Sequence, residues 1–216
     1  NSTVVFTNRN VTISAGTPSS GVTAADGSFE IAPTSTQTIK HTITNTGNQA
    51  EGSTTNPLQI AITDATTGNN VQPTGPVTVT IFDKNGSQVA TKTYTQLTNP
   101  INVSDVLATG IPVGGTATIS YTEASSNNTT SDGVVVTKTE KTTLTLTPSG
   151  TGAPAAVTAT DTFSVKSMTL VKTQVIDSNC DGNLDAGASY SNAAISNVLP
   201  GQCIIYRIEA LNGFTT

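Results

Sequence analysis

Residues 200–213 read PGQCIIYRIEALNG, and an altered copy, residues 33–47, reads PTSTQTIKHTITNTG. In both copies a proline comes first, an apolar residue follows six positions later, and an asparagine follows six positions after that. The period of two predicts, in each copy, a strand that turns one face to a core and ends in an Asn/Gly turn. Because a repeat implies an array of similar units, the chain reads as one module written twice. The aligned pairs are Ile39 with Tyr206, His41 with Ile208, Ile43 with Ala210, and Asn45 with Asn212.

The composition is that of an exported β protein. Of the 216 residues only 11% are charged, none is Trp, and about a fifth are Thr, whose β-branched side chain suits the exposed face of a sheet. The net charge of -5 and the scattered basic residues argue against a nucleic-acid partner. No apolar run is long enough to span a membrane, which predicts no membrane span in this chain. We expect an extracellular or bacterial cell-surface location.

Alternating segments follow one another at intervals of about ten residues with turn residues between them, as in a sandwich. The clearest pair, residues 77–82 and 87–94, flanks Asp-Lys-Asn-Gly and predicts a hairpin. The segment 15–28, rich in Gly and Ser, reads as a loop. No segment has a sustained helical period with caps. The sequence therefore predicts an all-β fold of tandem immunoglobulin-like sandwich modules, residues 1–166 and 167–216. Further strands are expected at residues 3–7, 10–14, 58–63, 101–103, 116–122, 133–138, 142–147, 157–165 and 168–173.

The second module resembles a tandemly repeated β-sandwich domain of unknown function found in long bacterial surface proteins. The resemblance rests on an opening strand with a lysine, a Pro-Gly pair and a Tyr-x-Ile-x-x-x-Asn strand. It implies a spacer or an adhesive unit of a stalk, a fibre or a surface layer. The first module resembles this family more loosely, and His41 stands where an apolar residue is usual. The matching residues are Lys172, Pro200, Gly201, Tyr206, Ile208 and Asn212.

The second module is short for a sandwich, so we expect it to be incomplete in this chain. A few strands alone would expose an apolar face and open edges. The missing strands would come either from further chain or from a neighbouring copy, as in head-to-tail filaments. For completion by a neighbour, the natural donors are residues 4–6 and 11–13.

An Asp- and Asn-rich turn is the most specific chemical motif. Oxygen-bearing side chains at its positions 1, 3, 5 and 9, with Gly182 at position 6, match the start of a calcium loop. Ala188 replaces the bidentate Glu at position 12. Calcium is one hypothesis, and an ion-free turn with Asx hydrogen bonds is the other. The candidate ligands are Asp177, Asn179, Asp181, Asn183 and Asp185.

The two cysteines, Cys180 and Cys203, predict a disulfide in an exported chain. The alternatives are two free thiols or half of a zinc site. A second possible covalent link is an isopeptide bond from Lys172 to Asn212, with Glu209 to shuttle the proton; an ordinary exposed lysine and a turn asparagine are the alternative.

The sequence contains no recognisable arrangement of catalytic residues. His41 is the only histidine, and its place on the inward face of a strand predicts a hydrogen-bonded core residue. Without a second histidine no alternative Ser-His-Asp arrangement exists, and a Cys-His pair is not expected because both cysteines should be bridged. We therefore expect no enzyme, but a structural or adhesive module of a surface protein or filament that assembles with itself. The alternatives are a glycan-binding module, although exposed aromatics are few, and an accessory module of a secreted enzyme.

Overall fold

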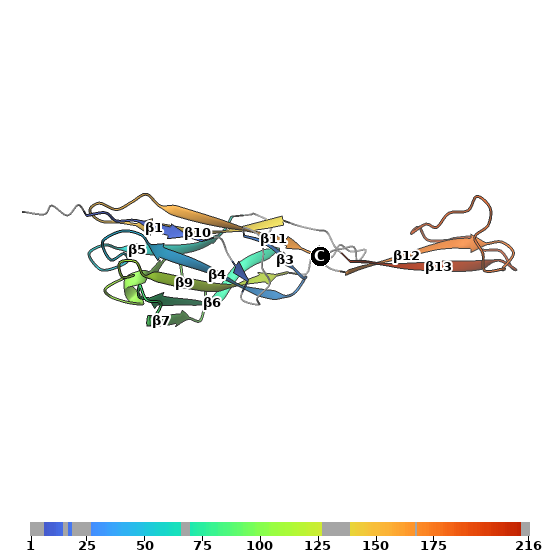
Figure 1. Ribbon diagram of the computed structural model, residues 1–216. Helices are drawn as coiled ribbons and strands as arrows, with labels where there is room; N and C mark the ends of the chain where they lie inside the picture. The colour runs from blue at the N-terminus through green and yellow to red at the C-terminus, as the bar shows by residue number, and fades with distance from the viewer. Residues whose placement is uncertain are drawn as a thin grey trace, which may run out of the picture. The chain divides into compact units, whose positions relative to one another are not determined.

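The computed structural model describes residues 7–14, 17–18, 27–65, 70–126, 139–166 and 168–212. Their regular structure consists of β-strands and one short 3-10 helix, η1 (Val103–Asp105). The described residues up to Lys166 form one compact unit, and those from Met168 form a second (Figure 1). The fold is all-β, as the alternating sequence predicts.

The first unit is an immunoglobulin-like sandwich of two sheets (Figure 1). One sheet has the order β1-β4-β9-β6-β7, with β2 also paired to β4, and all of its pairs are antiparallel. The strands are β1 (Val11–Ile13), β2 (Thr17–Pro18), β4 (Thr36–Asn45), β6 (Val71–Phe82), β7 (Gln88–Tyr94) and β9 (Thr116–Ser125).

The other sheet has the order β3-β11-β10-β5-β8. Its β3 and β11 run parallel, and the remaining neighbours are antiparallel. The strands are β3 (Ser28–Ile31), β5 (Leu58–Asp64), β8 (Ile101–Asn102), β10 (Thr139–Pro148) and β11 (Val157–Val165).

The core lies between these two sheets and follows the period of two. Ile39, Ile119 and Leu144 are fully buried, while the threonines between the inward residues face outward. Two outward threonine pairs, Thr78 with Thr93 and Thr80 with Thr91, place their Oγ1 atoms 3.0 Å apart across β6 and β7. Threonine thus covers the outer face of the sheet while the aliphatic residues fill the interior.

The hairpin predicted at residues 77–94 is confirmed. The Asp83 carboxylate accepts hydrogen bonds from the Asn85 and Ser87 amides at 2.9 Å, and Gly86 has a positive φ of 80°. An aspartate that caps its own turn and a glycine in the left-handed region are the features such turns require.

One expectation from the sequence needs correction, and two expected strands lie wholly or mostly outside the described residues. Residues 15–28 were expected to form a loop, yet β2 pairs with β4 here, because the edge of β4 beyond β1 is open to a short strand. The expected strand 133–138 and most of the strand 3–7 lie outside the described residues.

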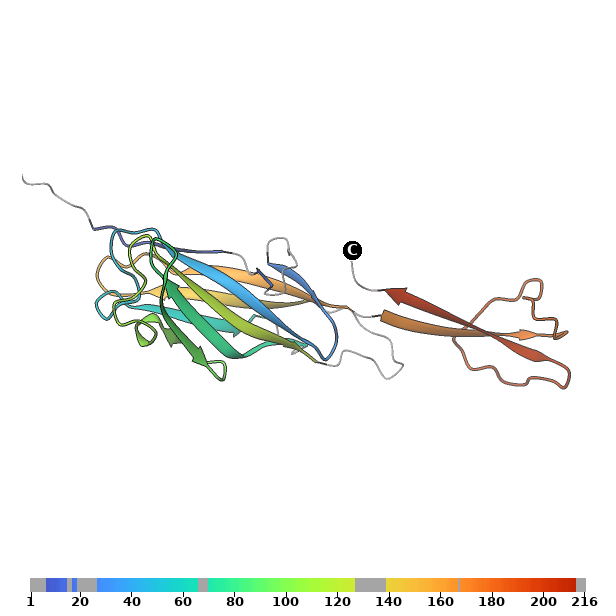
Figure 2. The same cartoon turned by 60° about the horizontal axis from the view of Figure 1, so that its bottom comes forward.

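The second unit contains one two-stranded antiparallel sheet, β12 (Met168–Asp177) with β13 (Cys203–Asn212). Residues 178–202 form loops at the end of this ribbon where β12 ends and β13 begins (Figure 2). Among the described residues, no helix has the length and hydrophobicity needed to cross a membrane.

Candidate functional site

The two copies of the proline-led motif fold into matching strands. β4 and β13 each have ten residues, begin three residues after the proline and end at the asparagine. The match extends to the partner strand. Val11 stands opposite Asn45 in the first unit, and Met168 stands opposite Asn212 in the second. β12 therefore occupies the place beside β13 that β1 occupies beside β4.

The same strand order continues along both ladders, with a shift of one residue between β1 and β2. Thr17 of β2 stands opposite Lys40, which aligns with Arg207, and Thr173 of β12 stands opposite Arg207. Thr17 lies six positions after Val11, whereas Thr173 lies five positions after Met168. β1 and β2 together thus correspond to the single long strand β12. The sequence repeat is also a repeat of strand pairing.

The environments of the two ladders differ. In β4 the inward residues Ile39, His41 and Ile43 are fully buried beneath the second sheet. In β13 the aligned Tyr206 and Ile208 are 53% and 68% exposed. On β12, Met168 and Leu170 share this face and are 66% and 68% exposed. We call this surface the open face: Met168, Leu170, Lys172, Gln174, Ile176, Ile204, Tyr206, Ile208 and Ala210.

Lys172 lies within the open face, with its Nζ 4.2 Å from the centre of the Tyr206 ring. This cation–π contact lets the ammonium group lie over an apolar surface. The apolar side chains around it nevertheless remain in water. A contiguous exposed apolar surface of this kind is typical of an interaction site.

The Asp- and Asn-rich turn forms a hydrogen-bonded loop directly after β12. Asp177 Oδ2 accepts from the Gly182 amide at 2.8 Å, and Asp185 Oδ2 accepts from the Ser178 amide at 2.9 Å. This amide holds the pKa of Asp185 below its usual value. Asp181 Oδ1 accepts from the Asn183 amide at 2.8 Å.

These bonds match the ion-free Asx alternative. Among the described residues, no three His, Cys, Asp or Glu side chains are arranged to hold a metal ion. The carboxylates of the loop accept from amides of the loop itself, which is the arrangement that the ion-free alternative predicts. Calcium binding stays a prediction, tested by the melting temperature with and without a chelator; an unchanged value would remove it.

The predicted disulfide is present between Cys180 and Cys203, with the two Cα atoms 5.1 Å apart. It joins the turn after β12 to the first residue of β13. Because both ends of the ribbon's loop segment are thereby fixed, the bond supports a unit that has little apolar interior of its own.

Lys172 and Asn212 lie too far apart to form the isopeptide bond that the sequence suggested. The register sets Lys172 opposite Ile208 and Asn212 opposite Met168, so the two residues are about 13 Å apart along the strands. The Lys172 ammonium group lies on Tyr206 instead. A lysine cannot attack an amide at that distance.

His41 is a buried core residue, as its inward position predicts. Its Nε2 lies 2.7 Å from Asp161 Oδ2 on the facing sheet, and its Nδ1 lies 3.0 Å from the Ser14 carbonyl. The Tyr121 hydroxyl donates to the same Asp161 oxygen at 2.9 Å. Burial, with the charges of Asp161 and Glu123, raises the pKa of Tyr121 and keeps it a donor. Since all three side chains are enclosed, they have no access to a substrate.

Glu123 is a second buried polar group, two residues after Tyr121. Among the described residues, neither of its carboxyl oxygens has a hydrogen-bond partner. Burial raises its pKa to about 8, the charges of Asp161 and Asp64 add to this rise, and the nearby Thr142 hydroxyl opposes it. Glu123 is therefore mainly protonated at neutral pH.

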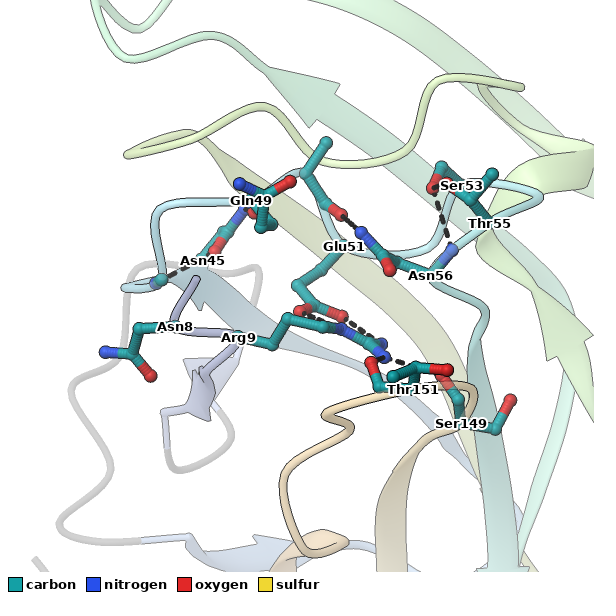
Figure 3. A network of polar contacts seen from close by, with 12 residues as sticks. Asn8, Arg9, Asn45, Gln49, Glu51, Ser53, Thr55, Asn56, Ser149 and Thr151 are labelled. Atoms are coloured by element: carbon teal, nitrogen blue, oxygen red, sulfur yellow. Dashed lines mark hydrogen bonds and ion pairs between the residues drawn. The ribbon is translucent and has the colours of Figure 1, made fainter. Parts of the chain in front are cut away.

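A bidentate ion pair fixes the start of the described chain to the sandwich (Figure 3). Arg9 Nε and Nη2 donate to the two carboxylate oxygens of Glu51, both at 2.8 Å. The remaining Nη1 donates to the carbonyl oxygens of Ser149 and Thr151. The hydrogen bond to Glu51 raises the pKa of Arg9, and burial opposes this rise. The guanidinium thus links three segments that lie far apart in the sequence.

The sequence patterns did not indicate four buried polar residues: Arg9, Glu51, Asp161 and Glu123. Glu123 continues the inward alternation of Ile119 and Tyr121, so periodicity alone could have placed it in the core. No sequence signal pairs Arg9 with Glu51, because 42 residues separate them.

One proposed donor strand is also corrected. Val11–Ile13 pairs with β4 in its own sandwich, and Val11 is buried in that core, so this segment is not available to a neighbour. The other proposed donor, residues 4–6, lies outside the described residues.

Comparison with known proteins finds no protein-family model and no curated protein that matches the chain. The resemblance to a tandem-repeat family therefore has no support from a family model. Among solved structures, BcpA, the major pilin subunit of Bacillus cereus, matches with 9% identity and a TM-score of 0.42, over 93% of this chain and 59% of BcpA. The adhesin CfaE of CFA/I enterotoxigenic E. coli matches with 13% identity and a TM-score of 0.37, over 72% of this chain and 48% of CfaE.

The CooA pilin subunit from enterotoxigenic Escherichia coli matches with 10% identity and a TM-score of 0.32, over 72% of this chain and 96% of CooA. The chain thus spans 59% and 48% of the length of the first two of these proteins. At this level of similarity, function has to be argued from the chain's own geometry.

Proposed function

We propose that this chain is a structural or adhesive module of a bacterial cell-surface protein or an extracellular filament, in which modules associate with one another. The observation that carries this proposal is the open face. It repeats the strand pairing and the inward side chains of a sandwich core, yet its large apolar residues are exposed. A surface built for a core stabilises the molecule only when another layer or strand covers it.

The chemistry of the chain supports a mechanical role. Two enclosed polar side chains of the first unit, Arg9 and His41, are paired with residues far away in the sequence and hold those segments together. The second unit is held by a disulfide, a bond that persists in oxidising surroundings outside the cytosol. We place the protein at the cell surface or outside the cell on this ground.

Negative-stain electron microscopy of the natively purified protein, together with its intact mass, tests this function. We expect regular filaments of chains of about 22 kDa, or a longer chain of repeated modules. Particles that remain single at high concentration, with a mass equal to one chain, would contradict it. Glycan-array binding by such single particles would favour the glycan-binding alternative.

A further inference from the structure

Along one edge of β13, the backbone N–H and C=O groups have no partner strand within the described residues. On the outer edge of β12, the Gln174 amide donates to the Ser191 carbonyl at 2.8 Å, and the Ser191 amide donates back at 3.0 Å. Gln174 therefore turns its peptide groups away from β13. In an antiparallel ladder, the residue opposite such a position also points outward. Tyr206 stands opposite Gln174, so its N–H and C=O point away from β12.

The alternation extends this assignment to other residues of β13. Residues two apart in a strand point their peptide groups to the same side, so Ile204, Ile208 and Ala210 share the orientation of Tyr206. Within the described residues, β12 is the one strand that pairs with β13. We call the side of β13 away from β12 the open edge.

The first unit shows what occupies the equivalent edge. The Thr42 carbonyl accepts from Ser14 on the β1 side of β4, whereas the Asn45 amide donates to Gly115 on the β9 side. The peptide N–H and C=O groups of even-numbered residues of β4 therefore point toward β1, and those of odd-numbered residues point toward β9. The odd-numbered residues Ile39, His41 and Ile43 align with Tyr206, Ile208 and Ala210. The open edge is thus the counterpart of the edge at which β4 binds β9.

β9 also shows which side chains fit beside this edge. It runs antiparallel to β4 and places Ala117, Ile119 and Tyr121 opposite Ile43, His41 and Ile39. Transferred to the second unit, a partner strand would place a small residue beside Ala210, a β-branched residue beside Ile208 and an aromatic residue beside Tyr206. These side chains would extend the open face and bury part of it.

The two edges of the ribbon differ in how they are protected. The outer edge of β12 is blocked by the Ser191 bridge and by the Gln174 side chain, whose Nε2 donates to the Ala193 carbonyl at 2.7 Å. β13 contains no proline, and its charged residues, Arg207 and Glu209, lie on the face opposite the open face. It thus lacks proline and inward charge, two devices that usually prevent strand addition.

We propose that the open edge of β13 is an acceptor site for one extended strand of a neighbouring polypeptide. This strand runs antiparallel to β13 and presents small, β-branched and aromatic residues, at every second position, to Ala210, Ile208 and Tyr206. The proposal rests on the proposed function, because it names the contact through which modules associate. Main-chain hydrogen bonds supply the affinity, and the alternating side chains supply the register.

Residue-resolved amide hydrogen exchange on the full chain tests the site, with a synthetic peptide of the β9 sequence, TATISYTEAS, as the probe. Without peptide, the amides of Tyr206, Ile208 and Ala210 should exchange fast, while those of Arg207 and Glu209 are protected by β12. Saturating peptide should slow the first set by about tenfold or more and the second set far less. Protection of the first set before peptide is added, or no change at saturation, would overturn the proposal.

Two variants distinguish the contribution of the backbone edge to peptide binding from that of the Ile208 side chain. Ile208→Pro removes an N–H that faces the open edge without removing a bond to β12, a position where a strand tolerates proline. Ile208→Val keeps the N–H and a β-branched side chain. We expect Ile208→Val to bind the peptide like the native chain and Ile208→Pro to lose binding, with Arg207 and Glu209 still protected as evidence of folding. Equal binding by both variants would overturn the proposal.

Electron microscopy of the same variants distinguishes this proposal from the proposed function. Filaments that persist in Ile208→Pro would leave the filament function in place and remove the open edge as its contact. Peptide protection in a chain that never assembles would support the acceptor site and contradict the filament function.

Discussion

β4 and β13 are strands of equal length with matching partners, yet β4 is enclosed and β13 is exposed. Ile39 has no exposed surface, whereas the aligned Tyr206 is 53% exposed. The difference arises from their neighbours: β4 lies between β1 and β9 and beneath a second sheet, whereas β13 pairs with β12 alone among the described strands. Alternation therefore marks which face of a strand is suited to a core, and the neighbouring strands decide whether that face is buried.

The ion pairs of the two units give the largest expected contrast. Glu51→Ala leaves the Arg9 guanidinium buried without its carboxylate and should lower the free energy of unfolding by about 3–5 kcal/mol. Glu209→Ala removes the exposed partner of Arg207, whose two side chains are each 48% exposed, and should cost at most about 1 kcal/mol. Urea denaturation of each unit measures the loss of unfolding free energy in both variants. Similar losses would contradict the expected difference between the buried and the exposed ion pair.

The aligned apolar residues give the next contrast. Ile39→Ala opens a cavity in a packed core and should cost about 2–5 kcal/mol. Tyr206→Ala truncates an exposed side chain and should change the stability of the second unit by less than about 1 kcal/mol. Thermal unfolding followed by near-UV and far-UV circular dichroism provides the measurement. A loss in Tyr206→Ala as large as that in Ile39→Ala would show that the open face is covered in solution.

Removing the disulfide should give the opposite result, with the larger loss of stability in the second unit. Replacing Cys180 and Cys203 together by alanine removes a link across 23 residues, which should destabilise the second unit by about 3 kcal/mol. The first unit has no share in this bond and should unfold as before. Hydrogen exchange resolved by residue can follow the two units in one sample. An equal rise in exchange in β4 and β13 would contradict their independence.

The pH dependence of stability should come mainly from the first unit. The folded state holds the pKa of Glu123 at about 8 against an ordinary value of 4.5, so it binds more protons than the unfolded chain between these pH values. Stability contributed by this group is present in full below pH 4.5 and falls by about 1.4 kcal/mol per pH unit up to pH 8.

Glu123→Gln cannot ionise and serves as the control for this prediction. The stability difference between it and the native chain should widen as pH rises from 5 to 8 and then become constant. Denaturant titrations at several pH values measure this difference. A difference that does not change with pH would mean that Glu123 is ionised in the folded protein.

Much of the strand pattern could be predicted from local sequence. The hairpin at residues 77–94 follows from an Asn-Gly turn between alternating runs, and the repeat predicted both β4 and β13. The pairing of Cys180 with Cys203 followed because the chain has no other cysteine. The isopeptide pair failed because its residues were chosen by analogy, without the register that sets Asn212 opposite Met168.

The sequence by itself determined the all-β fold, the inward face of each strand and the disulfide, because turn chemistry and a period of two are local properties of the chain. Only the tertiary structure decided that Glu51 receives Arg9, that Asp161 receives His41 and Tyr121, and that the equivalent faces of β4 and β13 have opposite fates. These outcomes depend on which distant strands become neighbours. Pairing between distant segments is set by the packing of whole sheets, and no short window of sequence contains that information.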